Sequence, residues 1–188
     1  MSKPKHPGHM DLERLRPLRV SDSIVLMTDP EFELQRVQYM ARLLMSQGRV
    51  FKKAPFDDRY PRLDRAGRCY DQAMCLAIDY EELTYCEGAM VFHWRGQLFA
   101  MPHGWCSNRE GFVIDPTCPK HQTDPAVSYL GLPIKKQYAL DWHSLYGFHG
   151  MLDGHPEYGD SVGLYADSPA LWCDSTLPPL PTLSGVSL

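Results

Sequence analysis

Three residues in the middle of the chain have side chains that together can perform acyl chemistry. Cys69 lies in GRCYDQA, and His103 and Asp115 lie at the two ends of HGWCSNREGFVID. A thiolate attacks a carbonyl carbon, an imidazole moves the proton that this attack requires, and a carboxylate fixes the orientation and tautomer of the imidazole. The sequence therefore predicts a thiol nucleophile, provided that the fold brings these three side chains together.

A strand hairpin is expected to place the histidine beside the aspartate. A five-residue turn over 107–111 would pair Cys106 with Phe112. This pairing sets His103 directly opposite Asp115 on the same face, with their Cβ atoms roughly 5 Å apart. The prediction depends on the register, because a slip of one residue turns the two side chains to opposite faces.

A helix over residues 67–80 is expected to carry Cys69 at its N-terminal end. Helical spacing along one face is shown by Cys69, Ala73, Leu76, Ala77 and Tyr80. Amide donors and the dipole at a helix N-terminus favour a thiolate, and the same amides can stabilise the oxyanion of a tetrahedral intermediate. Arg65 and Arg68 would add to this effect if they point inward, whereas Asp71 in the first turn opposes it.

The other predicted elements complete an α+β pattern. A capped helix is expected over 29–48. Strands over 84–94, 96–105 and 111–115 are expected to form an antiparallel sheet. A further strand and a short helix follow within 129–151.

The expected organisation is a single domain with irregular ends. Residues 1–28 are predicted to be an irregular N-terminal arm, and residues 29–165 a single catalytic-type α+β domain. Residues 166–188 are rich in Pro and Ser and are predicted to be a C-terminal tail.

The order of the motifs resembles the transglutaminase-like branch of the papain-like cysteine enzymes. That branch has a Cys at the start of a helix, a His on a strand before Ala-Trp or a similar pair, and an Asp-Pro on the next strand. GRCYDQA, HGW and FVIDPT follow this order over about 50 residues, 67–117, with Gly104 in place of the Ala. The segments CYDQAMCLAIDYEELTYCEG and YLGLPI also resemble uncharacterised bacterial and phage-type proteins that share this core.

The resemblance implies a papain-like fold in which the nucleophile helix packs on an antiparallel sheet. It makes Cys69 the nucleophile, His103 the general acid/base and Asp115 the residue that orients the histidine. The implied activity is acyl chemistry on a protein, a peptide or a small amide or ester through a Cys69 thioester, as in a peptidase, amidase, deamidase, transglutaminase or acyltransferase. Trp105 is expected to form a wall beside the site. Tyr60 is a candidate oxyanion donor, because no such side chain stands directly before Cys69.

Two competing hypotheses come from other classes. The first is a non-catalytic binding or regulatory protein that retains this fold and engages a partner through its proline-rich ends. The second is a zinc site built from Cys106, Cys118 and His121 with His93 or His103, since Cys118-x-x-His121 has ligand-like spacing. The chain has no CxxC pair, HExxH motif or glycine-rich phosphate loop, so we expect no metal and no nucleotide cofactor. Cys75 and Cys86 are predicted to be packing residues.

Composition argues against other partners. The 188 residues carry 19 basic and 23 acidic side chains, a net charge of -4, without a basic block that would bind nucleic acid or an anionic membrane. No stretch approaches the roughly 18 apolar residues of a membrane span, and the N-terminus lacks the apolar segment of a signal peptide. The six cysteines are scattered, which is typical of reduced thiols. A soluble, cytoplasmic protein of open oligomeric state is expected.

Overall fold

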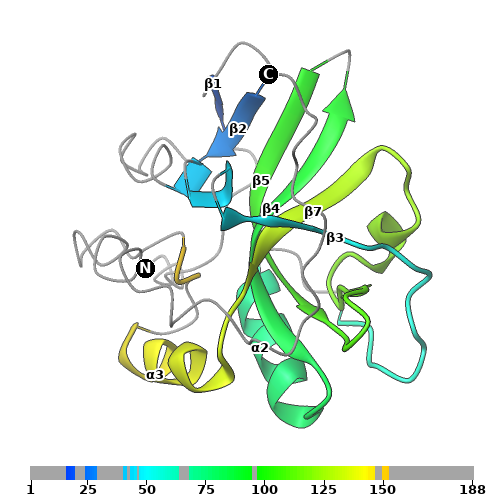
Figure 1. The fold of residues 1–188 in the computed structure, drawn as a ribbon, viewed down its shortest axis with the longest axis vertical. Coiled ribbons are helices and arrows are strands. Elements are labelled where there is room, and N and C mark those ends of the chain that lie inside the picture. The colour runs from blue at the N-terminus through cyan, green and yellow to red at the C-terminus, as the bar shows by residue number, and fades with distance from the viewer. Residues whose placement is uncertain are drawn as a thin grey trace, which may run out of the picture.

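The structure is a computed structural model of the chain, and it describes residues 16–19, 24–28, 40–41, 43–45, 47–63, 68–94, 97–146 and 150–152. Its strands are β1 (Arg16–Arg19), β2 (Ile24–Thr28), β3 (Arg49–Phe51), β4 (Thr84–Trp94), β5 (Gln97–Ser107), β6 (Val113–Ile114) and β7 (Val127–Pro133). The helices with described bounds are α2 (Cys69–Asp79), the 3-10 helix η2 (Pro119–Gln122) and α3 (Lys136–Tyr146) (Figure 1). Within the described ranges, no helix combines the length and the apolar character that a membrane span requires.

The strands form one sheet in the order β1-β2-β5-β4-β7-β3, with β6 also paired to β5. The pairings between its strands are antiparallel except that of β2 with β5, which is parallel. An α+β class with a mainly antiparallel sheet is therefore confirmed, and the predicted strands pair antiparallel as β4, β5 and β6. The parallel pairing of β2 with β5 was not predicted. The prediction of an irregular arm over 1–28 was wrong for residues 16–19 and 24–28, which form β1 and β2 and join the sheet, and the rest of this segment lies outside the described residues. Residues 153–188, which include the predicted tail, lie outside the described residues.

A long hairpin of β4 and β5 forms the centre of the sheet. Aromatic and aliphatic residues that favour strands fill TYCEGAMVFHW, and the predicted strand over 84–94 coincides with β4. The register runs from Thr84 opposite Ser107 to Trp94 opposite Gln97. On its other edge β4 pairs with β7, so the predicted strand and helix within 129–151 are confirmed as β7 and α3.

The sheet curls until the chain after β3 meets the chain before β6. The Lys52 N–H donates to the Gly111 carbonyl at 3.2 Å, and the Val113 N–H donates to the Lys52 carbonyl at 2.9 Å. The concave side encloses a cluster that we call the inner core, made of Phe51, Cys86, Met90, Trp105, Val113, Val127 and Tyr129. Cys86 is fully buried there, as predicted for a packing residue.

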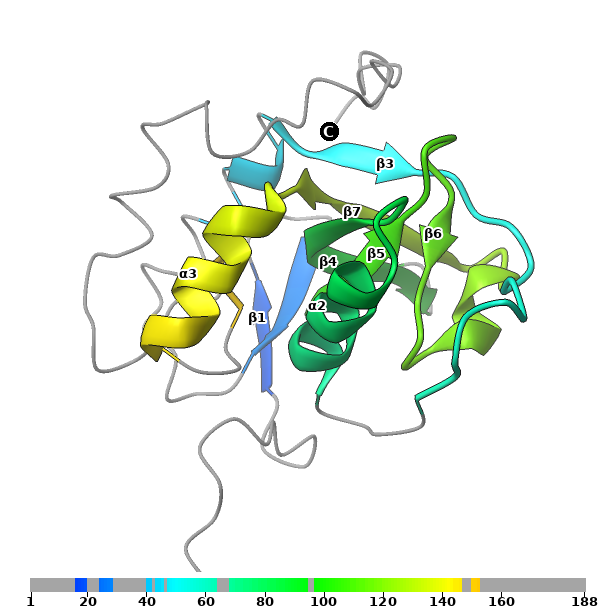
Figure 2. The ribbon, with the colours of Figure 1, turned by 90° about the horizontal axis from the view of Figure 1, so that it is seen from below.

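The helices cover the opposite face and bury a second, larger core, which we call the helix-side core. Figure 2 shows α2 and α3 side by side, and α2 packs against β4 and β5 while α3 packs against β4. The predicted apolar face of α2 is confirmed by the burial of Ala73, Leu76 and Ala77. Cys75 is exposed on the other side of the helix, so its predicted role in packing was wrong.

Part of the helix predicted over 29–48 is also described. Met40, Leu43 and Leu44 are helical and belong to the helix-side core. The Gly48 N–H donates to the Leu44 carbonyl at 2.9 Å, which agrees with the predicted end of this helix at Gly48. Residues 29–39 of the prediction lie outside the described part of the chain.

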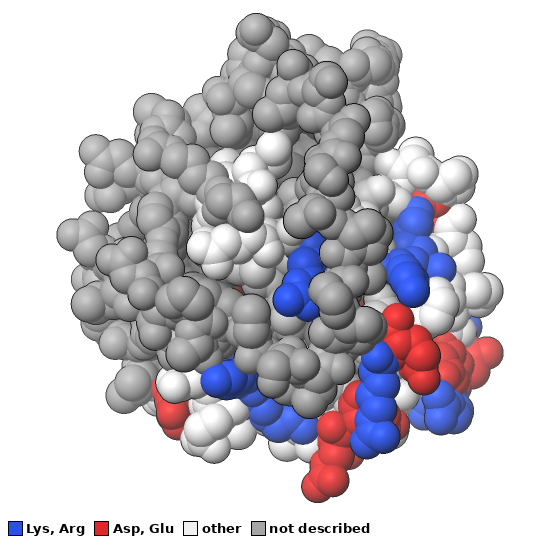
Figure 3. Space-filling model, in the orientation of Figure 1, with Lys and Arg blue, Asp and Glu red and all other residues white. Residues whose placement is uncertain are grey.

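Charged side chains of both signs are interspersed on the described surface. On the face seen in Figure 3, blue and red side chains lie next to one another. Two such pairs precede α2, where Arg59 contacts Asp57 at 2.6 Å and Arg62 contacts Asp58 at 2.5 Å. Exposed pairs of this kind contribute little to stability.

Candidate active site

The alternation of side chains along β5 separates the histidine from its sequence neighbours. Trp105 belongs to the inner core, and the His103 ring stacks beside it with 6.2 Å between ring centroids. Gly104 and Cys106 face the helix side, where the Cys106 thiol contacts the Ala73 carbonyl of α2 at 3.0 Å. Since successive residues of a strand point to opposite faces, His103 lies at the rim of the inner core.

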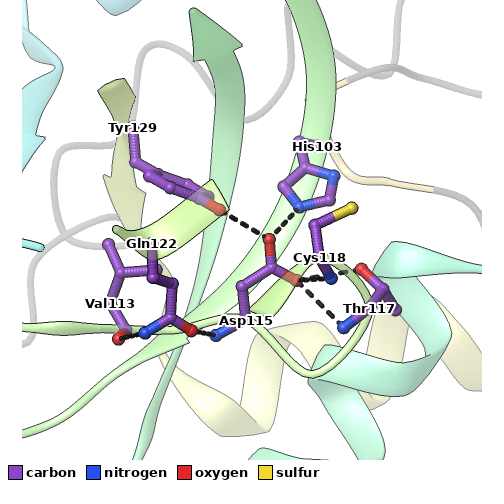
Figure 4. A network of polar contacts seen from close by, with 7 residues as sticks. All are labelled: His103, Val113, Asp115, Thr117, Cys118, Gln122 and Tyr129. Atoms are coloured by element: carbon purple, nitrogen blue, oxygen red, sulfur yellow. Dashed lines mark hydrogen bonds and ion pairs between the residues drawn. The ribbon is translucent and has the colours of Figure 1, made fainter. Parts of the chain in front are cut away.

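A buried contact joins the predicted histidine and aspartate. His103 Nε2 lies 2.8 Å from Asp115 Oδ2, and the side chains are 3% and 0% exposed, respectively (Figure 4). The pairing predicted for the hairpin was nevertheless wrong, because Cys106 pairs with Ile114 instead of Phe112. Asp115 is therefore diagonal to His103 and not directly opposite it. The partner of Cys106 lies two positions later than predicted, and because a shift by an even number does not exchange the faces of a strand, His103 and Asp115 still lie on the same face.

The loop between β5 and β6 explains this shift. Asn108 Oδ1 accepts the Phe112 N–H at 2.9 Å, and the Asn108 N–H donates to the Phe112 carbonyl at 3.0 Å. Gly111 has a φ of 79°, in the left-handed region that glycine adopts most readily. The loop therefore spans residues 108–112, one residue later than predicted at each end.

The Asp115 carboxylate is held by donors on both oxygens. Oδ1 accepts the Thr117 N–H at 3.0 Å, the Thr117 hydroxyl at 2.9 Å and the Cys118 N–H at 3.0 Å. Oδ2 accepts the Tyr129 hydroxyl at 2.8 Å in addition to the His103 ring. Figure 4 shows these donors converging on one side chain. Multiple donors of this kind fix the carboxylate and favour its charged form.

Gln122 fixes the backbone that carries the carboxylate. Its Oε1 accepts the Asp115 N–H at 2.6 Å, and its Nε2 donates to the carbonyls of Val113 at 2.8 Å and Ala54 at 3.1 Å. The side chain is buried, so these bonds link η2, β6 and the segment after β3 in the protein interior.

The electrostatics of the contact favour an ion pair. Burial alone would raise the pKa of Asp115, but the charge of His103 and hydrogen bonds from His103, Tyr129 and the Cys118 N–H lower it to about 2. Burial works against the charged form of His103, yet the negative charges of Asp115 and Cys69, together with hydrogen bonds to both, raise the pKa of His103 well above 6.5. The pair therefore consists of an imidazolium and a carboxylate near neutral pH.

Cys69 completes the cluster from the other side of β5. It is the first residue of α2, as predicted, and it is half-buried. Cys69 is among the groups that raise the pKa of His103, so the thiol lies near the ring. Because His103 Nε2 contacts Asp115, Nδ1 is the ring nitrogen left to face the thiol. The fold thus brings the three predicted residues together in the order Cys69, His103, Asp115.

The start of α2 approaches β5 where Gly104 has no side chain. A Cβ at Gly104 would lie 2.8 Å from Tyr70 Cδ1 and 3.0 Å from Tyr70 Cα. In the described part of the chain, β2 pairs with β5 only at residues 98–100, and β6 pairs with it only at residues 106–107. The edge of β5 between these two pairings is therefore not covered by another described strand and is open to the start of α2. The glycine that replaces the expected Ala therefore allows the close approach that sets Cys69 beside His103.

Substitution of this glycine tests the close approach. We expect Gly104→Ala to destabilise the protein by about 1–3 kcal/mol and to slow iodoacetamide labelling of Cys69, because the first turn of α2 must move away. Denaturant unfolding and peptide mass spectrometry measure the two effects. The control is Gly111→Ala, which meets no atom within 4 Å but is strained by the positive φ, and it should cost about 1 kcal/mol without changing Cys69 labelling. Equal labelling of Cys69 in both variants would contradict the prediction.

The charges around the helix start are partly balanced. Arg68 is the N-cap residue and makes no side-chain capping bond, but it forms an ion pair with the buried Asp71. The carboxylate in the first turn, which the sequence suggested would oppose a thiolate, therefore has a cation beside it. Arg65 lies outside the described residues.

The structure places only one of the two accessory residues predicted at the site, Trp105 and Tyr60, beside the candidate triad. Trp105 is buried beside His103, Phe51 and Tyr129, so it forms a wall of the inner core next to the site. Tyr60 is not brought to Cys69. Its hydroxyl lies 3.2 Å from Glu82 Oε1 and its ring packs on Tyr80, beyond the opposite end of α2. A helix of 11 residues is about 15 Å long, so Tyr60 is remote from an oxyanion at Cys69.

The predicted zinc ligands are not gathered as a set, but one of them lies at the site. Cys106 faces α2, away from His103, and His121 does not belong to the cluster of donor atoms found in the described residues. That cluster consists of His103, Asp115 and Cys118, whose donor atoms lie within 4.8 Å of one another. Sequence reasoning missed the roles of Tyr129 and Gln122 altogether. The only local signal was the Asp-Pro-Thr-Cys segment, in which an Asp typically accepts bonds from the backbone that follows it.

Comparison of the chain with protein-family models, with curated proteins and with solved structures finds no match.

Proposed function

We propose that the protein performs thiol-dependent acyl chemistry on an amide or ester, with Cys69 as nucleophile, His103 as general acid/base and Asp115 as orienting residue. The observation that carries this proposal is the buried 2.8 Å contact of His103 Nε2 with Asp115, with Cys69 close enough to the ring to raise its pKa. This arrangement fits a nucleophile activated by a base that a third group orients. The proposed fold assignment is papain-like, of the transglutaminase-like branch.

In the proposed reaction, Cys69 and His103 exchange one proton. The Cys69 thiolate attacks the carbonyl carbon, and the C=O electron pair moves to oxygen. The Nδ1–H of the His103 imidazolium then protonates the leaving amine or alcohol as the tetrahedral intermediate collapses to a thioester. In the second half, neutral His103 takes a proton from the acceptor, which attacks the thioester and releases the thiol. Water as acceptor gives a hydrolase, and an amine gives an acyltransferase.

The start of α2 supplies the proposed oxyanion site. The Gln72 N–H donates to the Arg68 carbonyl at 2.9 Å, which is the first intrahelical bond of the turn. Amides before this point have no intrahelical acceptor, so they are oriented toward the N-terminal end where Cys69 lies. This role replaces the one that the sequence suggested for Tyr60.

An activated aryl ester tests the proposal without knowledge of the natural substrate. We expect p-nitrophenyl acetate to acetylate Cys69 about a hundredfold faster than the exposed Cys75 in the same sample, since proton transfer by a positioned base contributes at least this factor. Peptide mass spectrometry locates the acetyl group, and hydroxylamine should remove it as it does any thioester.

Two variants serve as controls for this acylation. Cys69→Ser should abolish the fast nitrophenol release, and Cys75→Ser should leave it unchanged. Equal acetylation of Cys69 and Cys75, or release that survives Cys69→Ser, would favour a non-catalytic binding protein that retains the fold.

A further inference from the structure

A buried carboxyl group on the central strand β4 has no part in the proposed acyl chemistry. Glu87 is 1% exposed and lies directly opposite Gly104 of β5. Its side chain faces the helix side together with that of Tyr85, because residues two apart in a strand share a face. Oε1 accepts the Tyr85 hydroxyl at 2.7 Å, and Oε2 accepts the Leu152 N–H at 2.9 Å. Burial of a carboxyl group is costly without such bonds, so these two donors fix its place.

The bond to Leu152 fixes the chain that follows α3. Met151 and Leu152 are buried in the helix-side core. The bond from the Leu152 N–H to Glu87 is buried as well, and it joins residues 65 positions apart in the sequence. A buried N–H that loses its acceptor costs free energy. Glu87 therefore holds residues 150–152 at the centre of the sheet.

This segment lies against the residue that follows the nucleophile. A Cβ at Gly150 would lie 2.6 Å from Tyr70 Cζ and 3.1 Å from Glu87 Oε2. A Cβ at Gly104 would lie 2.8 Å from Tyr70 Cδ1 and 3.3 Å from the Tyr70 nitrogen, so the ring contacts both glycines. Cys69 is joined to that nitrogen by the peptide bond. A shift of Tyr70 therefore also shifts the thiol.

We propose that Glu87 is a positioning residue, which through Leu152 holds residues 150–152 against Tyr70 and thereby keeps Cys69 beside His103. This role needs an acceptor at Oε2 and no contact with the substrate, and it rests on the proposed function of Cys69. Without the acceptor, the Leu152 N–H gains free energy by turning toward water. Residues 150–152 then no longer hold the Tyr70 ring, and the start of α2 moves away from the imidazole.

Three variants of the full chain separate the contacts of this carboxyl group. Glu87→Met removes the acceptor and keeps a side chain of similar length. Glu87→Gln keeps an oxygen for the Leu152 N–H and presents an N–H to the Tyr85 hydroxyl oxygen, so both contacts survive. Tyr85→Phe removes only the donor to Oε1 and leaves the bond to Leu152. Urea unfolding gives the stability of each variant.

The pH dependence of iodoacetamide labelling of Cys69 is then compared in the four proteins, with the exposed Cys75 as internal reference. We expect Glu87→Met to move the Cys69 profile toward that of Cys75. We also expect it to slow acylation by p-nitrophenyl acetate about a hundredfold, because a misplacement of about 1 Å costs about this factor. Glu87→Gln and Tyr85→Phe should keep the wild-type profile.

A merely structural role would lower the urea midpoint of Glu87→Met without moving its Cys69 profile, and this result would overturn the proposal. A profile in Glu87→Gln that moves as far as that in Glu87→Met would also overturn it, since the charge and not the bond to Leu152 would then matter. Gly150→Ala disturbs the same contact while Glu87 stays in place, because the added methyl group would lie 2.6 Å from Tyr70 Cζ. It should move the profile in the same direction, and an unchanged profile would again count against the proposal.

Failure of the positioning role is distinguishable from failure of the proposed function. A wild type whose Cys69 profile follows that of Cys75 contradicts the proposed function itself, and the positioning role falls with it. An activated Cys69 in the wild type, with the same profile in Glu87→Met and Gly150→Ala, contradicts only the role of Glu87.

Discussion

Asp115→Asn is expected to lower the free energy of unfolding at neutral pH by about 2–3 kcal/mol. The pKa of Asp115 is about 2 in the folded protein, held down by His103 and by hydrogen bonds despite burial, and it is about 3.9 in an unfolded chain. A carboxyl group whose folded pKa is the lower one contributes stability above the unfolded pKa. This contribution is lost as the pH falls from about 4 to about 2, and the Asn variant lacks it throughout.

Denaturant unfolding between pH 2 and pH 7 measures this loss. The wild type should lose stability below about pH 4 more steeply than Asp115→Asn, because only the wild type has this carboxyl group to protonate. Tyr129→Phe is the matched milder variant, since it removes one donor to Oδ2 and keeps the carboxylate. It should cost about 1 kcal/mol and retain the acid dependence. Parallel pH profiles for the wild type and Asp115→Asn would contradict the ion pair.

The same substitution is expected to disturb the histidine. In Asp115→Asn, the side-chain amide would present an N–H where Asp115 Oδ2 now accepts from His103 Nε2. A neutral imidazole would then carry its proton on Nδ1 and could not accept one from Cys69. Loss of the orienting carboxylate with the wrong tautomer costs about four orders of magnitude in the Ser-His-Asp enzymes, so Asp115→Asn should acylate Cys69 no faster than Cys75.

His103→Ala is expected to slow iodoacetamide labelling of Cys69 at pH 6 by about a hundredfold. Burial lowers the pKa of His103, but the charges of Asp115 and Cys69 outweigh this effect and raise it well above 6.5. The ring is therefore an imidazolium at pH 6, and its positive charge stabilises a thiolate beside it. An ordinary thiol is ionised to only about 0.3% at pH 6, which sets the rate expected without the imidazolium. Labelling is followed with a chelator present, so that bound metal does not affect it.

Two comparisons separate this effect from a general loss of structure. The exposed Cys75 provides an internal reference in each sample. His121→Ala removes a histidine outside the donor cluster of the site and should label Cys69 like the wild type. If His103→Ala labels Cys69 as fast as the wild type, the imidazole does not activate the thiol.

The residues of the candidate site could be predicted because their local context carries information. Cys69 stands at the start of a periodic helix, and His103 and Asp115 flank a polar turn between strands. Both features follow from patterns within about 15 residues. The prediction that His103 and Asp115 lie on the same face was correct, but the predicted register was wrong. The observed turn is held by the hydrogen bond from the Phe112 N–H to the Asn108 side chain, and composition alone does not reveal which turn forms.

The parts that could not be predicted depend on contacts distant in sequence. β2 is a strand through its parallel pairing with β5, about 70 residues later, where Ile24 lies opposite Leu98. Tyr129 and Gln122 act at the site only because β7 and η2 come to lie beside Asp115 in the folded chain. Tyr60 is near Cys69 in sequence, but its hydroxyl lies 3.2 Å from Glu82 Oε1 and its ring packs on Tyr80, and both of these residues follow the other end of α2.

The pH dependence of Cys69 labelling in the wild type tests the central claim most directly. The rate of iodoacetamide labelling of Cys69, located by peptide mass spectrometry in the presence of a chelator, should already be high below neutral pH. The rate for Cys75, whose pKa is raised by partial burial and by Asp71, should rise only in the alkaline range. A Cys69 profile that follows that of Cys75 over the whole range would contradict the proposal that His103 and Asp115 activate Cys69.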